Sequence, residues 1–436
     1  MEVNVNQTLA IECEWTDPVG ESIELAETAA TIDISLGDRH ITRAENDFSK
    51  TVSNRSLLSA YPLALWLANS WWRLRWETTP PRTLSSEWRM SHELPAAGGG
   101  FVWPRVIFES DSESIRLRMR PSPYSPFEPV RYLEDLHGWI TGHEFERAVS
   151  TFLDLVSARL TERGLRNTQL QLLWSEVTAE RADPVLTRFR RVEAILGFDP
   201  GTATDDLVTR FITLSETAGL AASEEIAHAA AGQRQRAEHV LTEFLDAIDK
   251  VSLTGKFQIS ATPETRFLPD TTPWKRGYEV AQRIRENHNL GIGTLNDKTL
   301  ASLLGLKKNI FRDDVSAKPP VAGITVRGVK NDQFFFRRKH RRDRRFEAAR
   351  MLSDHLLAPD SDTWLIETDA HTARQQAQRA FAAEFLCPIV SLQEYLDGDI
   401  SDTRIEEAAD NFEVSDFIVR RQLFNNRVPG SNLIIF

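Results

Sequence analysis

The chain has 436 residues and a formal net charge of −11, with 41% hydrophobic and 26% charged residues. This length predicts about three domains, and the composition is that of an ordinary globular protein. The acidic balance excludes a protein that coats nucleic acid over its whole surface.

The cysteines and the N-terminus indicate the compartment. Cys13 and Cys387 are the two cysteines, and they fit no metal-binding or redox spacing, so we expect no disulfide framework and a reducing environment. The first residues lack a basic segment followed by an apolar one, and no apolar run approaches the length of a membrane span. We therefore expect a cytoplasmic protein without a membrane partner.

Residues 1–128 predict an N-terminal α+β module. The segments at 31–44 and 101–122 alternate like strand hairpins, and the segment at 61–77 has helical spacing. The module also holds seven of the chain's 11 tryptophans, namely Trp15, Trp66, Trp71, Trp72, Trp76, Trp88 and Trp103. Such residues are enriched at recognition surfaces, but their helical spacing favours core packing for most of them.

Residues 129–251 predict a helical region, because apolar residues recur with helical spacing in segments such as 145–164 and 234–250. A segment rich in Thr and Pro at 252–273 predicts a linker. It leads into a third domain, residues 270–436, which gives the chain as a whole an expected α+β class.

The third domain combines helices with a small sheet. Residues 273–290 predict an amphipathic helix and residues 322–338 a hairpin. Residues 402–427 have the spacing of a helix-turn-helix pair, with the turn at Val414 and Ser415. The second helix carries four apolar residues, Phe417, Val419, Leu423 and Phe424, which favour packing of this helix over base reading. Arg420 and Arg421 are the polar exceptions.

Two segments in this domain resemble a known metal site. The sequences RRFEAARMLSDHLL (344–357) and QQAQRAFAAEFLCP (375–388) resemble the core of the ImmA/IrrE family of zinc metallopeptidases, which reads R-F-T-L-A-H-E-x-G-H-L-L and then E-x-E-A-N-x-F-A-A-E-L-L-M-P. The resemblance covers roughly residues 270–430. It implies a zincin-like, mostly helical domain with a small sheet, from a family whose active members cleave helix-turn-helix repressors.

The residues that perform the chemistry of this family are replaced. The resemblance places the two metal-binding histidines at Arg350 and Asp354, the glutamate between them at Met351, and the downstream glutamate at Gln375 or Ala377. An arginine cannot ligate a cation and a methionine cannot act as a base, and Asp354 alone is one ligand of three. We therefore expect no catalytic residue and no zinc at this degenerate site.

Other roles for this region remain open. Arg350 and Asp354 have the i, i+4 spacing of a helical ion pair, which predicts a salt bridge in place of the metal; alternatively, Arg350 points to solvent. A zinc site with displaced ligands would have to use residues such as Asp354, His355, His340 or His371. In that alternative the chain is an active endopeptidase that cleaves a repressor.

A dense basic run precedes the degenerate helix. Between residues 337 and 345 it holds seven basic residues, Arg337, Arg338, Lys339, Arg341, Arg342, Arg344 and Arg345, against one Asp. A run of this density is typical either of a solvated loop or of a surface that binds phosphate or an acidic partner, and we favour binding.

Together these observations predict a bacterial pseudo-peptidase that acts by binding a protein partner. The partner would be a repressor, a toxin or a defence component, in gene regulation, a toxin–antitoxin pair or phage defence. A nucleic-acid-binding regulator that uses the basic run is a further alternative.

Overall fold

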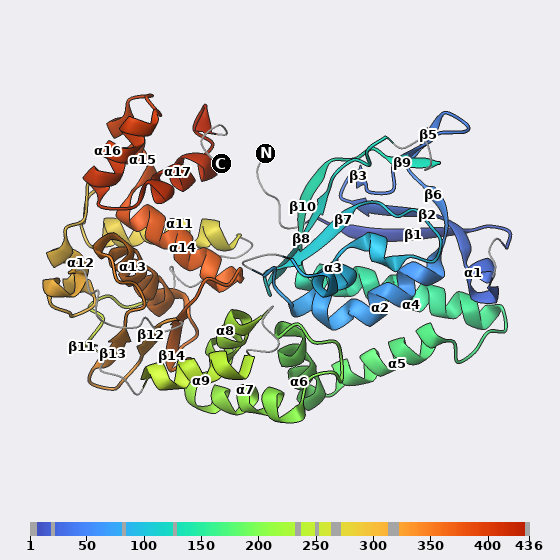
Figure 1. Cartoon of the computed structure of the whole chain (residues 1–436), viewed down its shortest axis with the longest axis horizontal. Coiled ribbons are helices and arrows are strands. Elements are labelled where there is room, and N and C mark those ends of the chain that lie inside the picture. Colours follow the sequence, from blue (N-terminus) through green and yellow to red (C-terminus); the bar gives the residue numbers. More distant parts are fainter. Residues whose placement is uncertain are drawn as a thin grey trace. The chain divides into compact units, whose positions relative to one another are not determined.

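The chain forms two compact units. The computed structural model describes residues 7–18, 22–80, 84–124, 129–231, 237–248, 253–262, 272–312 and 322–431. One unit comprises Met1–Ile212 and Ala231–Arg234, and the other comprises Thr213–Ala230 and Gln235–Phe436. Each combines helices with small antiparallel sheets, which confirms the predicted α+β class (Figure 1).

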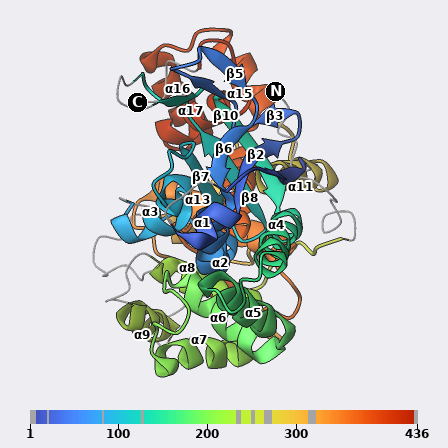
Figure 2. The same ribbon diagram turned by 90° about the vertical axis from the view of Figure 1, so that its right-hand side faces the viewer.

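The sheets of the N-terminal unit are short and antiparallel. In the first, β2 pairs with β1, β3 and β6, and Figure 2 shows β6 beside β2. The second has the order β10-β8-β7 and the third β5-β4-β9. The strands are β1 (Leu9–Trp15), β2 (Ala29–Leu36), β3 (Arg39–His40), β4 (Ala44–Asn46), β5 (Thr51–Ser53), β6 (Ser56–Ser59), β7 (Val106–Ser110), β8 (Ser114–Met119), β9 (Val130–Tyr132) and β10 (Leu136–Thr141).

The helices of this unit cover the sheets. They are α1 (Ile23–Glu27), α2 (Ala60–Trp76), α3 (Ser86–His92), α4 (Gly142–Glu162), α5 (Gln169–Ala182) and α6 (Pro184–Ile195), with a 3₁₀ turn at Leu94–Ala97. Helix α2 begins where Ser59 accepts a hydrogen bond from the backbone N–H of Tyr61. Its tryptophans Trp66, Trp71 and Trp72 are buried, as predicted, in one core with residues of α4 and α5.

The predicted boundaries at residues 128 and 251 differ from this division. Strands β9 and β10 lie beyond residue 128 and pair with earlier strands, because their partners β4 and β8 leave an edge free for them. Helices α4, α5 and α6 share the core of the N-terminal unit, and the division falls within α7 (Asp205–Ala218). The helices predicted as one central region are therefore shared between the two units.

The C-terminal unit is mostly helical around one sheet of order β11-β13-β12-β14. Its strands are β11 (Leu253–Gly255), β12 (Gly323–Val326), β13 (Asp332–Phe335) and β14 (Trp364–Glu367). Its helices are α8 (Leu220–Ala230), α9 (Ala237–Ile248), α11 (Pro273–Asn287), α12 (Asp297–Leu303), α13 (Arg341–Leu357), α14 (Ala373–Leu386), α15 (Ile389–Leu396), α16 (Asp402–Phe412) and α17 (Asp416–Asn425), with a 3₁₀ turn at Lys308–Phe311.

Several sequence-based expectations for this unit can be checked directly. The hairpin of β12 and β13, the amphipathic helix α11 and the helix pair α16 and α17 lie where they were predicted. The segment predicted as a linker begins with β11, which pairs with β13, so its start belongs to the sheet. Residues 263–271 of that segment lie outside the described residues.

Helices α11 and α14 approach each other closely at one glycine. A Cβ atom on Gly277 would lie 2.1 Å from the carbonyl oxygen of Ala377, far inside normal van der Waals contact. The absence of a side chain at Gly277 therefore lets α11 pack directly on the backbone of α14. This contact holds α14, which carries several residues of the site described below.

We predict that Gly277→Ala destabilises the C-terminal unit by about 1–3 kcal/mol, because the added methyl group must push α11 away from α14. Gly293→Ala is the matched control, since a Cβ atom there would meet nothing within 4 Å. Thermal unfolding of both variants measures the effect. Equal melting temperatures for the two variants would show that the α11–α14 approach is not tight.

Candidate functional site

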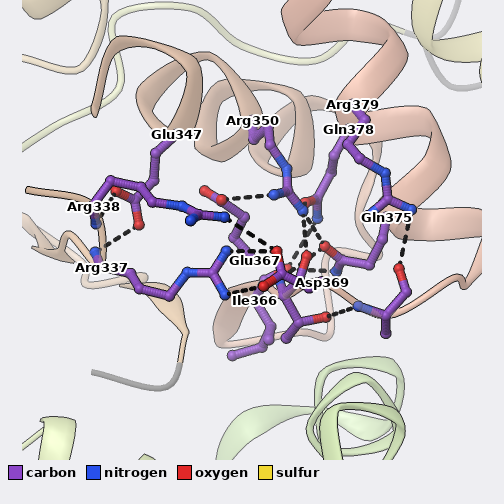
Figure 3. A network of polar contacts seen from close by, with 12 residues as sticks. Arg337, Arg338, Glu347, Arg350, Ile366, Glu367, Asp369, Gln375, Gln378 and Arg379 are labelled. Carbon is purple, nitrogen blue, oxygen red and sulfur yellow. Dashed lines mark hydrogen bonds and ion pairs between the residues drawn. The ribbon is translucent and has the colours of Figure 1, made fainter. Parts of the chain in front are cut away.

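The centre of the site is the side chain of Arg350, which is buried between α13, the end of β14 and α14 (Figure 3). Its Nη1 donates to Glu367 Oε1 at 2.8 Å, and its Nη2 donates to Gln375 Oε1 at 2.5 Å. Nη2 also donates to the carbonyl oxygen of Thr368 at 2.7 Å and to Gln378 Oε1 at 3.3 Å. One guanidinium thus joins α13 to β14 and α14.

Asp354 takes a different partner. Its carboxylate accepts two hydrogen bonds from Arg374, Nε to Oδ1 at 2.7 Å and Nη2 to Oδ2 at 2.8 Å. Oδ2 also accepts the backbone N–H of Ile366 in β14. Burial lowers the pKa of Arg374, but the nearby carboxylates of Asp354, Glu225 and Asp362 outweigh it and raise that pKa above its usual value.

The predicted salt bridge between Arg350 and Asp354 is therefore wrong, and so is the alternative of an Arg350 in solvent. Both side chains are almost completely buried, with 3% and 1% of their residue surface exposed. A buried charge needs partners in contact with it, and these lie in later elements: Glu367 of β14 for Arg350 and Arg374 of α14 for Asp354. Spacing along one helix does not reveal such partners, because they come from later elements of the chain.

Two buried carboxylates meet beside Arg350. A Cβ atom on Gly323 would lie 2.6 Å from Glu347 Oε1 and 3.2 Å from Glu367 Oε2, so both acids converge on this glycine of β12. Burial and the neighbouring Glu367 carboxylate raise the pKa of Glu347 to about 8, although its oxygens accept the backbone N–H groups of Arg337 and Arg338. Burial also raises the pKa of Glu367, against the effect of Arg350.

Gln375 links the network to α8. Its Oε1 accepts from Arg350 and from the backbone N–H of Thr368, and its Nε2 donates to Glu225 Oε2 and to the carbonyl oxygen of Ile366, both at 2.9 Å. Glu225 belongs to α8, is buried, and also accepts the hydroxyl of Thr372. Burial raises the pKa of Glu225 to about 7, mainly opposed by Arg374.

The remaining degenerate positions are apolar. Met351 and Ala377 are 2% and 4% exposed, and the terminal methyl group of Met351 lies close to Gly323. The five positions singled out by the sequence therefore lie on two packed helices, where Arg350 and Gln375 are hydrogen-bonded to each other.

These residues do not fit zinc. The Arg350 guanidinium carries a positive charge and uses the oxygens of Glu367 and Gln375 as its own acceptors. Both oxygens of Asp354 are bound by Arg374. A cation placed at these acceptors would meet guanidinium groups, so no step of metal-assisted hydrolysis follows from this arrangement.

The histidines considered as displaced ligands do not gather at this site. His355 is stacked on Phe257 at a ring distance of 4.0 Å, and its Nε2 lies 2.9 Å from the carbonyl oxygen of Ile259. Burial, with the charge of Arg327, lowers the pKa of His355 to about 4. His340 and His371 are exposed. Within the described residues, which include all three, no three His, Cys, Asp or Glu side chains are grouped as a metal site.

The basic run is engaged largely within the chain. Arg337 binds Asp369 through both terminal nitrogens, and Arg338 contacts the same carboxylate. Arg341 and Arg345 contact Asp297 and Glu413, Arg342 contacts Asp410, and Arg344 donates to the carbonyl oxygen of Arg312. Arg345 is completely buried. Lys339 is half-buried. The binding role of this run stays a prediction, with most of its charge already balanced by nearby acids.

Sequence reasoning missed the acids and the arginine that complete the site, namely Glu225, Glu347, Glu367 and Arg374. Glu347 and Arg374 lie inside or next to the motif segments, but their helices carry many other polar and charged residues, so neither stood out. Glu225 carried no signal, because nothing in α8 distinguishes it from a surface acid beside Glu224.

No protein-family profile, curated protein or solved structure matches this chain, so the ImmA/IrrE resemblance stays a prediction. Across the described parts of the chain, no helix is long and apolar enough to cross a membrane.

A double-mutant cycle tests the observed pairing. We predict that Arg350→Ala destabilises the protein by about 3–5 kcal/mol, because it leaves the Glu367 carboxylate buried without its cation. The double variant Arg350→Ala/Glu367→Gln should lose clearly less free energy of unfolding than the sum of the losses in the two single variants. The expected coupling energy is about 0.5–3 kcal/mol. The cycle of Arg350→Ala with Asp354→Asn is the control, and urea unfolding is the measurement. A larger coupling for Arg350 with Asp354 than with Glu367 would contradict the pairing.

The buried Glu225 predicts a pH dependence of stability. Because its pKa is about 7 in the folded protein and near 4.5 in the unfolded chain, the unfolded state loses this proton first as the pH rises. Its contribution to stability is therefore complete below pH 4.5 and is lost as the pH rises through 7. Glu225→Gln should raise the melting temperature relative to the parent at pH 8 and leave it nearly unchanged at pH 5. A difference that is the same at both pH values would refute the assignment.

Proposed function

We propose that this chain is a bacterial, cytosolic pseudo-peptidase that acts by binding a protein partner. In this proposal the C-terminal unit is related to the ImmA/IrrE metallopeptidases and has lost their chemistry. The partner is a repressor, a toxin or a defence component, and the process is gene regulation, a toxin–antitoxin pair or phage defence.

One observation carries the proposal. Arg350 stands where the resemblance expects a metal-binding histidine, and its guanidinium is hydrogen-bonded to Gln375, which stands where the resemblance expects an acidic ligand. A cation supplied by the protein itself thus bridges the two helices that a zinc ion would bridge. The site is closed by internal partners, because the Arg350 guanidinium donates to Glu367 and to the carbonyl oxygen of Thr368.

A domain that loses its metal-binding and catalytic residues but keeps its packing also keeps the surface that binds other proteins. Function resides in the site and not in the fold, so losing the ligands removes hydrolysis and leaves binding. The N-terminal unit, which the resemblance does not cover, supplies additional surface for a partner. This argument supports recognition without cleavage as the role of the chain.

The test combines metal content with the fate of a partner. Protein purified without a polyhistidine tag should contain far less than one equivalent of zinc, and a chelator should change neither its stability nor its complexes, because a bound metal would be linked to folding. Proteins encoded by neighbouring genes are purified and mixed with the chain one at a time. At least one should form a complex and remain intact.

Stoichiometric zinc together with chelator-sensitive cleavage of such a partner would refute the proposal. The control is a variant of the chain with Arg350→His, Met351→Glu, Asp354→His and Ala377→Glu, which restores the family's ligand types at these positions. If this variant folds, it should bind more zinc than the parent protein. Zinc binding equal to that of the parent would argue against the alignment with the family.

A further inference from the structure

One arginine of the site lacks the partner that its neighbours have. Arg337, Arg350 and Arg374 each contact at least one carboxylate. Arg379 of α14 donates from Nη2 to the carbonyl oxygen of Ala370 at 3.0 Å, and among the described residues no carboxylate is in contact with it. Figure 3 shows its side chain at the edge of the network, directed away from Glu347.

The environment of Arg379 leaves its charge poorly balanced. Burial and the nearby Arg350 guanidinium lower the pKa of Arg379 to about 9, and Asp369 and Glu225 act on it only from beyond contact distance. The side chain is nevertheless partly exposed. A guanidinium that is partly desolvated and lacks an acid partner gains strongly from binding an oxyanion.

A second arginine without an acid partner lies on the neighbouring helix. Arg421 of α17 is exposed and is close enough to Arg379 to lower its pKa, and α17 packs against α14. Among the described residues its contact is with the ring of Phe417, with its guanidinium carbon 5.8 Å from the ring centroid. The adjacent Arg420, in contrast, binds Asp402 at 2.7 Å.

Arg421 shares one face of α17 with two exposed phenylalanines. Positions 417, 421 and 424 fall on one face of a helix, and Phe417 and Phe424 are 51% and 40% exposed. This differs from the expectation that both phenylalanines pack inward; Val419 and Leu423 fill that role on the opposite face. The exposed face of α17, a helix that packs against α14, thus combines a cation with apolar surface.

We propose that Arg379, Arg421 and the flanking rings of Phe417 and Phe424 form a binding site for an acidic segment of the protein partner. The carboxylates of this segment would bind the two guanidiniums, and its apolar side chains would cover the two rings. Charge complementarity supports this occupant, because these two arginines contact no carboxylate among the described residues, although the chain as a whole has a net charge of −11.

This inference deepens the proposed function and rests on it, since it names the chemistry of the partner. A nucleic acid is the other polyanion that two arginines attract. The exposed aromatic rings accommodate apolar side chains or stacked bases, so the experiment has to include both ligands. The acidic protein segment is favoured because a strongly acidic chain repels a long phosphate backbone.

The test uses the full chain and a short fluorescent peptide of alternating Glu and Phe at low salt. Fluorescence anisotropy should show saturable binding to the parent protein. Arg379→Gln and Arg421→Gln should each weaken it about tenfold or more, which corresponds to the loss of one charge-assisted hydrogen bond. Arg420→Gln is the matched control on the same helix and should bind as the parent does, because Arg420 is already paired with Asp402.

Three results would contradict the proposed binding site. They are an absence of peptide binding by the parent protein, equal weakening by Arg420→Gln, and tighter binding of a single-stranded oligonucleotide through the same two arginines. The double variant Arg379→Gln/Arg421→Gln then separates this inference from the proposed function. If it still binds the intact partner identified with purified components, the site is wrong and the proposed function stands; if the parent itself binds no partner, the proposed function fails.

Discussion

The C-terminal unit depends on how it accommodates the buried positive charge of Arg350. A guanidinium removed from water is tolerated only when acceptors surround it, and here they come from β14 and α14. The side chain therefore cross-links α13 to the elements that follow it in sequence. Neighbouring buried charges are balanced in the same way. Arg374 forms ion pairs with both Asp354 and Asp362. The packed helices and their charges form one interdependent arrangement.

This arrangement is held together by hydrogen bonds and ion pairs. A catalytic metal ion would require deprotonated ligands and an open position for water, whereas here the Arg350 and Arg374 guanidiniums occupy oxygens of Glu367, Gln375 and Asp354. Glu347 and Glu367 converge beside Arg350, and burial favours a proton on this pair. Glu225 joins from α8, so a helix outside the resembling segments helps to close the site. The proposed binding surface lies apart from this closed interior, at Arg379 and Arg421, which contact no carboxylate among the described residues.

Much of the fold followed from local patterns. The hairpin of β12 and β13, the helix α11 and the α16–α17 pair were predictable because alternation and helical spacing are properties of short segments. The ion-pair partners of the buried residues were not predictable from such patterns. Arg350 and Asp354 have an ideal helical spacing, yet each binds a residue beyond the helix, because burial makes contacts with neighbouring elements dominate. Phe417 and Phe424 were assigned inward for their apolarity alone, although Val419 and Leu423 already fill that face.

The most direct test of the account is anomalous diffraction at the zinc absorption edge, from crystals of the untagged protein soaked in excess zinc. The account predicts no zinc peak within coordination distance of Asp354, Gln375 or Glu225, and density for the Arg350 guanidinium between Glu367 and Gln375. A zinc ion bound among these side chains, with Arg350 turned away, would contradict it.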